Sequence, residues 1–191
     1  MSEKKKTRRL PKSCATVVAG APAIILINPQ LGENIGMSAR AMLNNALGDL
    51  RLVAPVHGWP NDKAIKPSAG AEVILDAVQV FATTAEALSG LSHVYATTAR
   101  DRDMTKRVLS ARAAAEEMRG VIAAGGRPGV IFGREAWGLN NDDVALADTL
   151  VTIPMNPAFS SLNLAQAVLL IGYEWFQSGD TTPAIDERIP K

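Results

Sequence analysis

Short apolar runs alternate along the chain with longer segments of helical periodicity. The runs at residues 23–28, 50–55, 78–82, 92–98, 128–133 and 149–154 have the length and composition of buried β-strands. Segments 33–48, 84–90, 110–125, 140–147 and 162–177 have the apolar spacing of helices, and residues 62–77 are helical in pieces. This alternation predicts an α/β fold with a mostly parallel sheet flanked by helices.

Polar residues at the segment boundaries predict where helices begin and end. Asn34 is expected to cap the first helix, Gly48 to end it, and Thr83 or Thr84 to cap the helix at 84–90.

The last helix is preceded by an unusual number of small polar and turn-forming residues. They are Asn156, Pro157, Ser160, Ser161 and Asn163, with the two serines as candidate caps. Capping needs only one such group. The surplus indicates that this segment also faces something other than its own helix.

Composition limits the class of protein. The 191 residues are 47% hydrophobic and 20% charged, which suits one compact domain. One cysteine excludes an internal disulfide, and with only two histidines it argues against a zinc site. The sequence has no secretory signal, and its last helix is too short and too polar to span a bilayer, so a cytoplasmic location is expected.

Charge is concentrated at the amino terminus. Residues 1–12 hold six Lys or Arg and one Glu, so this segment carries +5 while the whole chain carries only +1. We expect a flexible basic arm at residues 1–20, a folded domain at 21–178 and a loosely ordered tail at 179–191. Such an arm can contact RNA phosphates or serve only as a solubilising terminus.

Several common catalytic motifs are missing. No strand–turn–helix carries Gly-x-Gly-x-x-Gly, and the sequence contains neither a Gly-Lys-Ser/Thr phosphate loop nor a Gly-x-Ser-x-Gly elbow. Nicotinamide-dependent, P-loop and serine-hydrolase chemistry therefore lose their main support.

Ligands of parallel α/β sheets bind beyond the carboxyl ends of the strands. Residues 29–40, 97–107, 133–138 and 154–163 occupy these positions. In the first of them, Gly36 and Arg40 share one helical face, where a missing side chain leaves room for an anionic ligand to reach the backbone. The alternative is an amphipathic helix with a surface arginine.

Two other segments carry charge at the same edge. Gly133 permits a tight turn or a close backbone approach, and Arg134 and Glu135 follow it as either ligand-facing groups or a solvent-exposed ion pair. Residues 99–112 hold five basic residues, which suit phosphate contacts or a solvated mixed-charge loop: Arg100, Arg102, Lys106, Arg107 and Arg112.

Four motifs in order resemble one family. NIGMSARAM, TTAR, VIFGREAWGLNNDD and VTIPMNPAFSSLNLAQAVLLIGYE are similar to motifs of the SpoU/TrmH branch of the SPOUT RNA methyltransferases. The resemblance covers residues 23–177 and is greatest to the TrmJ type, which methylates the ribose 2′-oxygen of nucleotide 32 in the tRNA anticodon loop. TrmJ-type proteins usually carry a further carboxyl-terminal extension that aids tRNA binding, whereas this sequence ends soon after the last motif.

The resemblance implies a carboxyl-terminal trefoil knot, a homodimer and S-adenosyl-L-methionine as the methyl donor. It places the cofactor at Thr97, Thr98, Ala99, Gly133, Ile153, Ser160, Ser161 and Leu162. It places polar groups near the reacting centre at Asn34, Arg40, Glu135, Ser161 and Asn163. Arg40, Arg100, Arg102, Lys106 and Arg107 are the expected RNA contacts, and no metal is expected.

Arg40 is the key residue that the resemblance implies. A guanidinium stays protonated and is a poor base, so we expect Arg40 to bind the target phosphate and to orient or acidify the hydroxyl, with help from Ser161 or Asn163. Three alternatives remain: methylation of rRNA or another tRNA nucleotide, a non-catalytic RNA-binding module on the same fold, and a nucleotide-dependent oxidoreductase, which lacks its glycine fingerprint.

Overall fold

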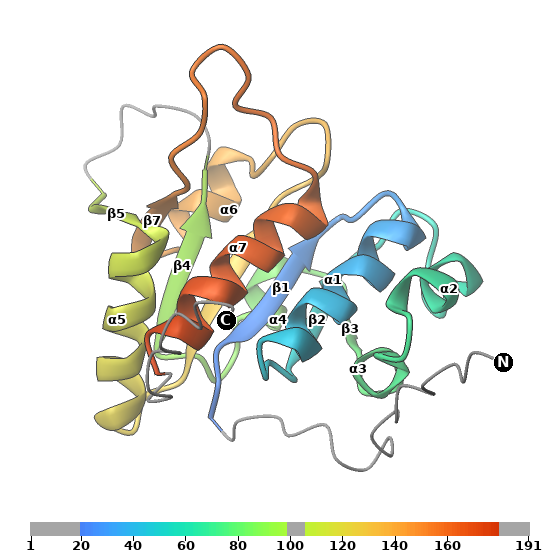
Figure 1. The fold of residues 1–191 in the computed structure, drawn as a ribbon, viewed down its shortest axis with the longest axis horizontal. Coiled ribbons are helices and arrows are strands. Elements are labelled where there is room, and N and C mark those ends of the chain that lie inside the picture. Colours follow the sequence, from blue (N-terminus) through green and yellow to red (C-terminus); the bar gives the residue numbers. More distant parts are fainter. Residues whose placement is uncertain (1–19, 99–105, 180–191) are drawn as a thin grey trace, which may run out of the picture.

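A computed structural model describes residues 20–98 and 106–179 of the chain. Within these ranges strands and helices alternate as predicted (Figure 1). The strands are β1 (Ala23–Ile27), β2 (Leu50–Val53), β3 (Gln79–Phe81), β4 (His93–Thr97), β5 (Val108–Ser110), β6 (Pro128–Phe132) and β7 (Thr149–Thr152). The helices are α1 (Gly32–Asn44), the 3₁₀ turn η2 (Asp62–Ala64), α2 (Ile65–Ser68), α3 (Glu72–Asp76), α4 (Thr84–Ala87), α5 (Ala111–Ala123), α6 (Asn141–Ala145) and α7 (Leu164–Gln177).

The strands form one sheet in the order β3-β2-β1-β6-β4-β7-β5, and all six pairings are parallel. The predicted fold class is confirmed, with one strand more than predicted. β5 was expected to belong to a polar loop, but Val108 pairs with Leu150 at the edge of the sheet. This strand has three residues and its Val108 side chain is 53% exposed, so it lacks the buried apolar run that identifies the other strands.

Two apolar layers enclose the sheet. Consecutive strand residues point to opposite faces, so Tyr95 packs in one layer while Val94 and Ala96 pack in the other. The first layer includes buried side chains of α1, α5 and α7, which cover one face side by side (Figure 1). The second layer includes Ala87 of α4 and Val144 of α6.

Helix ends differ from the sequence prediction in several places. α1 begins at Gly32 and Asn34 lies inside its first turn, 2% exposed, so Asn34 is not the cap. The helix ends at Asn44, and the left-handed residue that follows is Ala46 (φ 58°), so Gly48 does not end it. The predicted Thr83 cap of α4 is confirmed and forms a capping box with Glu86.

The cap of α7 is Asn163, and the prediction of Ser160 or Ser161 was wrong. The Asn163 side chain accepts a hydrogen bond from the Ala165 N–H (2.9 Å), and the Asn163 N–H donates to the side chain of Gln166 (3.1 Å). This reciprocal pair is a capping box. The helix therefore begins at Leu164, two residues later than predicted, and leaves both serines in the preceding segment.

Gly36 serves helix packing. A Cβ at this position would lie 2.1 Å from the carbonyl oxygen of Ala64, so η2 can pack against α1 only because residue 36 has no side chain. The expectation that a ligand approaches the backbone at Gly36 is therefore wrong.

Most of the predicted arm and tail lie outside the described residues. Within the described ranges, no helix is long and apolar enough to cross a membrane.

Candidate active site

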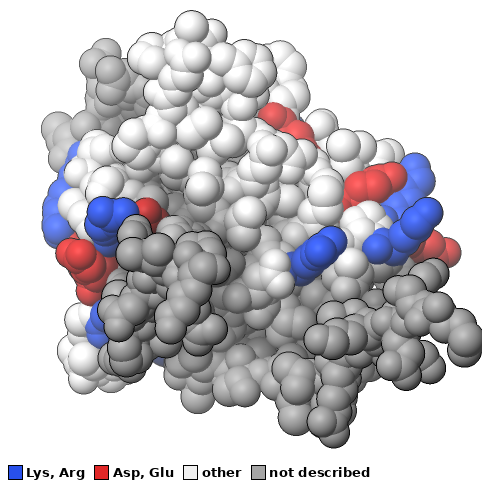
Figure 2. Space-filling view, viewed as in Figure 1, with Lys and Arg blue, Asp and Glu red and all other residues white. Residues whose placement is uncertain are grey.

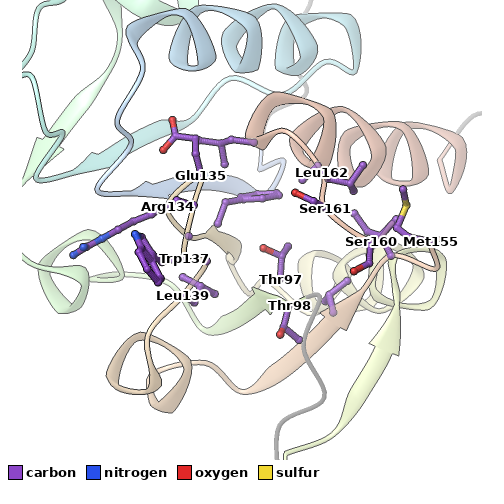
Figure 3. A pocket seen from close by; sticks show the side chains of 18 residues that line it. Thr97, Thr98, Arg134, Glu135, Trp137, Leu139, Met155, Ser160, Ser161 and Leu162 are labelled. Atoms are coloured by element: carbon purple, nitrogen blue, oxygen red, sulfur yellow. The ribbon is translucent and has the colours of Figure 1, made fainter. Parts of the chain in front are cut away.

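A cavity of about 320 Å³ opens at the carboxyl edge of the sheet (Figure 3). Its walls are the end of β4, the turn after β6, and the segment that leads from β7 into α7. The lining residues are Thr97, Thr98, Phe132, Gly133, Arg134, Glu135, Ala136, Trp137, Gly138, Leu139, Val151, Ile153, Met155, Ser160, Ser161, Leu162, Leu164 and Ala167. Three segments far apart in sequence thus meet at one site.

The turn after β6 is closed by its own backbone. Arg134 and Gly138 exchange two backbone hydrogen bonds of 3.2 and 2.9 Å, and Gly138 has a left-handed φ of 68°. A Cβ on Gly133 would lie 2.1 Å from the carbonyl carbon of Gly138. The predicted close backbone approach at Gly133 is confirmed.

The cavity offers both apolar and hydroxyl surfaces. Leu139, Ile153 and Leu162 supply aliphatic surface, and Thr97, Thr98, Ser160 and Ser161 supply hydroxyl groups from two different walls (Figure 3). The Thr97 hydroxyl donates to the Ile131 carbonyl (3.0 Å), which fixes its rotamer at the end of β4. Such a lining suits a ligand with a flat ring and a few polar groups.

Glu135 connects the cavity turn to α1. Its carboxylate accepts hydrogen bonds from the N–H groups of Gln30 (2.9 Å) and Leu31 (3.1 Å) and from the Asn34 side-chain amide (3.0 Å). These donors lie at the amino-terminal end of α1, where the helix dipole favours an anion. Arg134 does not pair with Glu135 in the structure, so the interpretation as an exposed ion pair is wrong.

Burial acts to raise the pKa of Glu135, but the hydrogen bonds from Asn34, Gln30 and Leu31 outweigh it. The net result is a pKa below the usual value of a glutamate. Glu135 is therefore a carboxylate near neutral pH and has its oxygens occupied by donors. It is suited to holding the turn in place and poorly suited to accepting a proton.

Asn34 and Asn163 extend this network to α7. The Asn163 side-chain amide donates to the side-chain oxygen of Asn34 (2.9 Å), and the amide of Asn34 donates in turn to Glu135. One chain of hydrogen bonds thus joins the cavity turn, the start of α1 and the cap of α7. Three of the predicted polar site residues are brought together in it.

The predicted cofactor-binding residues lie almost entirely at the cavity. Seven of the eight predicted cofactor residues line the cavity, and Ala99 lies outside the described residues. Sequence reasoning missed much of the apolar lining, including Phe132, Val151 and Met155, because such residues carry no signal beyond ordinary core positions.

Arg40 does not line the cavity. It lies exposed on α1, and among the described residues no side chain or carbonyl forms a hydrogen bond or salt bridge with it.

The predicted basic RNA contacts are partly engaged within the protein. The Lys106 ammonium donates to the carbonyls of Ala145 (2.7 Å) and Ala147 at the end of α6. Arg107 forms a salt bridge with Glu117 (2.5 Å), which also accepts a hydrogen bond from the Tyr95 hydroxyl (3.0 Å). Arg100 and Arg102 lie outside the described residues. Arg112, the other described basic residue of this segment, forms a salt bridge with Glu174 (3.1 Å). The interpretation of the segment as a solvated loop thus changes for Lys106, Arg107 and Arg112, of which the first two help to attach β5 to its neighbours.

Comparison with known proteins decides the family. Residues 21–173 match the sequence profile described as the SpoU rRNA Methylase family. The chain belongs to this family. The match includes the strands, the cavity turn and most of α7, which are the parts that build the site.

Individual relatives agree with this assignment. The chain is 42% identical over 151 residues to a Pseudomonas aeruginosa protein named tRNA (cytidine/uridine/adenosine-2′-O-)-methyltransferase TrmJ, covering 79% of this chain and 58% of that protein. It is 37% identical over 173 residues to a Salmonella choleraesuis protein named tRNA (cytidine/uridine-2′-O-)-methyltransferase TrmJ. This match covers 87% of this chain and 70% of that protein. The crystal structure of TrmJ from Z. mobilis ZM4 superposes with a TM-score of 0.78 at 53% sequence identity. The superposition covers 87% of this chain and 74% of that chain. The chain thus spans little more than half the length of the Pseudomonas protein.

Proposed function

We propose that the protein transfers a methyl group from S-adenosyl-L-methionine to a ribose 2′-hydroxyl of tRNA, at nucleotide 32 of the anticodon loop. The observation that carries this proposal is the single cavity formed by three of the motif segments. Two relatives that match 79% and 87% of this chain are named as tRNA 2′-O-methyltransferases. A tRNA substrate would place the protein in the cytoplasm.

The cavity residues fit the donor. A volume of about 320 Å³ lies at the lower end of the range for small-molecule sites. The apolar wall formed by Leu139, Ile153 and Leu162 suits an adenine ring, and the threonine and serine hydroxyls suit a ribose and an amino-acid group. Gly133 and its neighbours in the turn line the cavity, so their main-chain groups are available to the donor. When bound, the donor supplies a methyl group that is already activated on a sulfonium.

Because the donor is already activated, the chain mainly has to position the attacking hydroxyl and stabilise its loss of a proton. We assign Arg40 to the target phosphate, since its guanidinium is exposed and has no partner among the described residues. Ser161 faces the cavity, where its hydroxyl can help orient the ribose. Glu135, Asn34 and Asn163 are positioning residues, which hold the cavity turn against α1 and α7 through their hydrogen bonds.

We infer that the carboxyl-terminal part forms the trefoil knot that the family resemblance implies. In support, β7 lies between β4 and β5 in the sheet, and the chain then crosses to α7 on the face shared with α1 and α5. The β4–β5 connection includes residues 99–105, outside the described ranges. An experimentally determined main-chain trace through residues 98–107 tests the knot.

We also infer a homodimer that buries an apolar face of α1 and α7. Met37 of α1 and Leu169, Tyr173 and Phe176 of α7 are between 39% and 50% exposed. The three α7 residues are spaced four and three apart, so they share one side of the helix. Figure 2 shows few charged side chains over the segment before α7 and the start of that helix. Apolar surface of this kind is typical of a subunit interface.

Methylation of defined RNAs tests the proposed function. A tRNA transcript with ribose at nucleotide 32 should accept one methyl group, and the same transcript with 2′-deoxyribose there should accept none. Methylation at another tRNA nucleotide or on rRNA would support the alternative substrate. Donor binding without methyl transfer to any RNA would support the non-catalytic module.

A further inference from the structure

Arg134 is held in place by a neutral partner. Its guanidinium donates through Nε (3.2 Å) and Nη2 (2.9 Å) to the side-chain oxygen of Asn28 at the end of β1. No carboxylate among the described residues forms a salt bridge with it. The arginine is therefore oriented while its positive charge stays available at the rim of the cavity.

Asn28 is itself fixed by its surroundings. Its backbone is left-handed (φ 45°), its N–H donates to the Val53 carbonyl (2.8 Å), and its side-chain amide donates to the Ala54 carbonyl (3.2 Å). Ala54 is also left-handed (φ 40°). Strained backbone of this kind at two adjacent strand ends is characteristic of functional sites. Here it presents the Asn28 oxygen to the guanidinium.

Glu135 does not neutralise Arg134 although the two are adjacent in sequence. The Glu135 carboxylate faces the start of α1 and is occupied by its three donors. In Figure 3 the Arg134 side chain extends away from that carboxylate. The turn thus separates its two charges, one toward α1 and one toward solvent.

Trp137 lies beside Arg134 at the mouth of the cavity (Figure 3). Its side chain is 68% exposed, although the turn that carries it is closed by the two Arg134–Gly138 backbone hydrogen bonds. An exposed indole on a hydrogen-bonded turn, beside a guanidinium that no carboxylate neutralises among the described residues, is a combination that single-stranded RNA can use. The ring stacks on an unpaired base and the arginine binds a phosphate.

We propose that Arg134 and Trp137 form a second RNA contact, in which Arg134 binds a phosphate and Trp137 stacks on an unpaired base next to the target nucleotide. This proposal rests on the proposed function: Arg134 and Trp137 would bind the anticodon loop in addition to Arg40. Asn28 is the positioning residue of the pair.

The Asn28→Asp variant tests the charge directly. An aspartate tolerates the left-handed backbone and would place a carboxylate against Arg134, which neutralises the charge of the arginine without removing its side chain. The aspartate also loses the hydrogen bond to the Ala54 carbonyl, a loss that the Arg134→Gln variant below does not share. Affinity for the tRNA transcript should fall about fivefold, and the slope of log affinity against log salt should decrease by about one. Donor binding, followed by calorimetry, should persist and thereby report an intact cavity.

Two further variants separate charge removal from loss of the fold. Arg134→Gln should reproduce the lower salt slope. Arg127→Gln removes an exposed arginine just before β6, at the opposite edge of the sheet, and should leave the slope unchanged. If Asn28→Asp and Arg134→Gln both bind tRNA with the wild-type salt slope while the wild type methylates tRNA, Arg134 has no phosphate contact. If the wild type neither binds nor methylates RNA, the proposed function fails as well.

Trp137→Leu tests stacking. Loss of one stacked base should weaken tRNA binding about tenfold or more, and the salt slope should stay at the wild-type value because no charge is removed. Weaker donor binding with unchanged tRNA affinity would instead place the indole on the cofactor and overturn this part of the proposal.

Discussion

The hydrogen bonds of Glu135 suit its carboxylate to organising the site and not to accepting a proton. A charged residue after a buried glycine invites interpretation as a general base. The donors from Gln30, Leu31 and Asn34 lower its pKa, however, and occupy its oxygens. Its position at the amino-terminal end of α1 adds a favourable interaction with the helix dipole. We therefore expect its removal to act on stability and on the shape of the cavity.

Replacing Glu135 by glutamine should destabilise the fold by about 1–2 kcal/mol near neutral pH, because a neutral amide loses charge-assisted hydrogen bonds and turns an NH₂ toward other donors. The native pKa of Glu135 is lowered, so its contribution is fully present above the unfolded-state value of about 4.3. It is lost as the pH falls through the native value. Denaturant unfolding of both proteins across this range measures the difference.

The variant should thus differ most from the wild type at pH 7 and converge with it in acid. A difference that stays constant down to pH 2, or that grows in acid, would show that the Glu135 charge is not what stabilises the turn.

At the scale of elements, periodicity was a good guide to the buried strands and long helices and a poor guide to their ends. β1 and β6 are apolar at nearly every position because both sheet faces are covered, so their runs are recognisable. β5 has no such run, and its place beside β7 depends on long-range pairing. Likewise, Lys106 and Arg107 look like free surface charges in the sequence, but in the fold Lys106 binds a carbonyl of α6 and Arg107 binds a carboxylate of α5.

The candidate site was predictable to the extent that local motifs carry it. Gly133, Thr97 and Ser161 stand in recognisable segments at strand ends and do line the cavity. The identity of the residue that caps α7 could not be predicted from sequence: the cap is Asn163 and not Ser160 or Ser161. Several residues had equal capping propensity, and the contact with Asn34, 129 positions away, distinguishes Asn163 from them.

Asn163 offers a matched pair of substitutions that separates its two roles. Asn163→Asp keeps an oxygen for the Ala165 N–H but loses the donor to Asn34, whereas Asn163→Ala loses both. We expect the alanine variant to lose about 1 kcal/mol of stability from the cap, and the aspartate variant to retain the cap energy. Both variants should bind the donor more weakly, because the segment ahead of α7 loses its link to α1.

Thermal unfolding and donor titration measure the two effects separately. Equal stability losses in the two variants would contradict the assignment of the cap to the Asn163 oxygen. Wild-type donor affinity in both would show that the Asn34 link does not shape the cavity.

At the scale of the whole molecule, one chain does not unite all the proposed catalytic groups. Arg40 lies on α1 outside the cavity of its own chain, on the helix that carries Met37 of the proposed interface. α1 packs against α7 within the chain, both helices carry residues of the proposed interface, and α7 begins at the cavity. A two-fold contact through this interface would place α1 of one protomer against α7 of the other, the helix that begins at the cavity. We therefore infer that Arg40 acts on the partner's cavity.

Heterodimers test this arrangement. One protomer carries Arg40→Ala with an intact cavity. The other keeps Arg40 but carries Leu162→Trp, which fills the cavity, or Gly133→Ala, whose Cβ would collide with Gly138. Each homodimer should be nearly inactive, since every site lacks one component. A heterodimer purified through two different tags should recover about half of the wild-type turnover, because one of its two sites is complete.

If Arg40 served the cavity of its own chain, the same heterodimer would contain no complete site and would remain as inactive as its parents. Equal donor binding by the Arg40→Ala homodimer and the wild type serves as the control that its cavity is intact. A heterodimer of two Arg40→Ala protomers carrying the same two tags should stay inactive, so that recovered turnover can be attributed to the unmodified arginine. The result thus decides whether the catalytic unit of this fold is a single chain or a pair of chains.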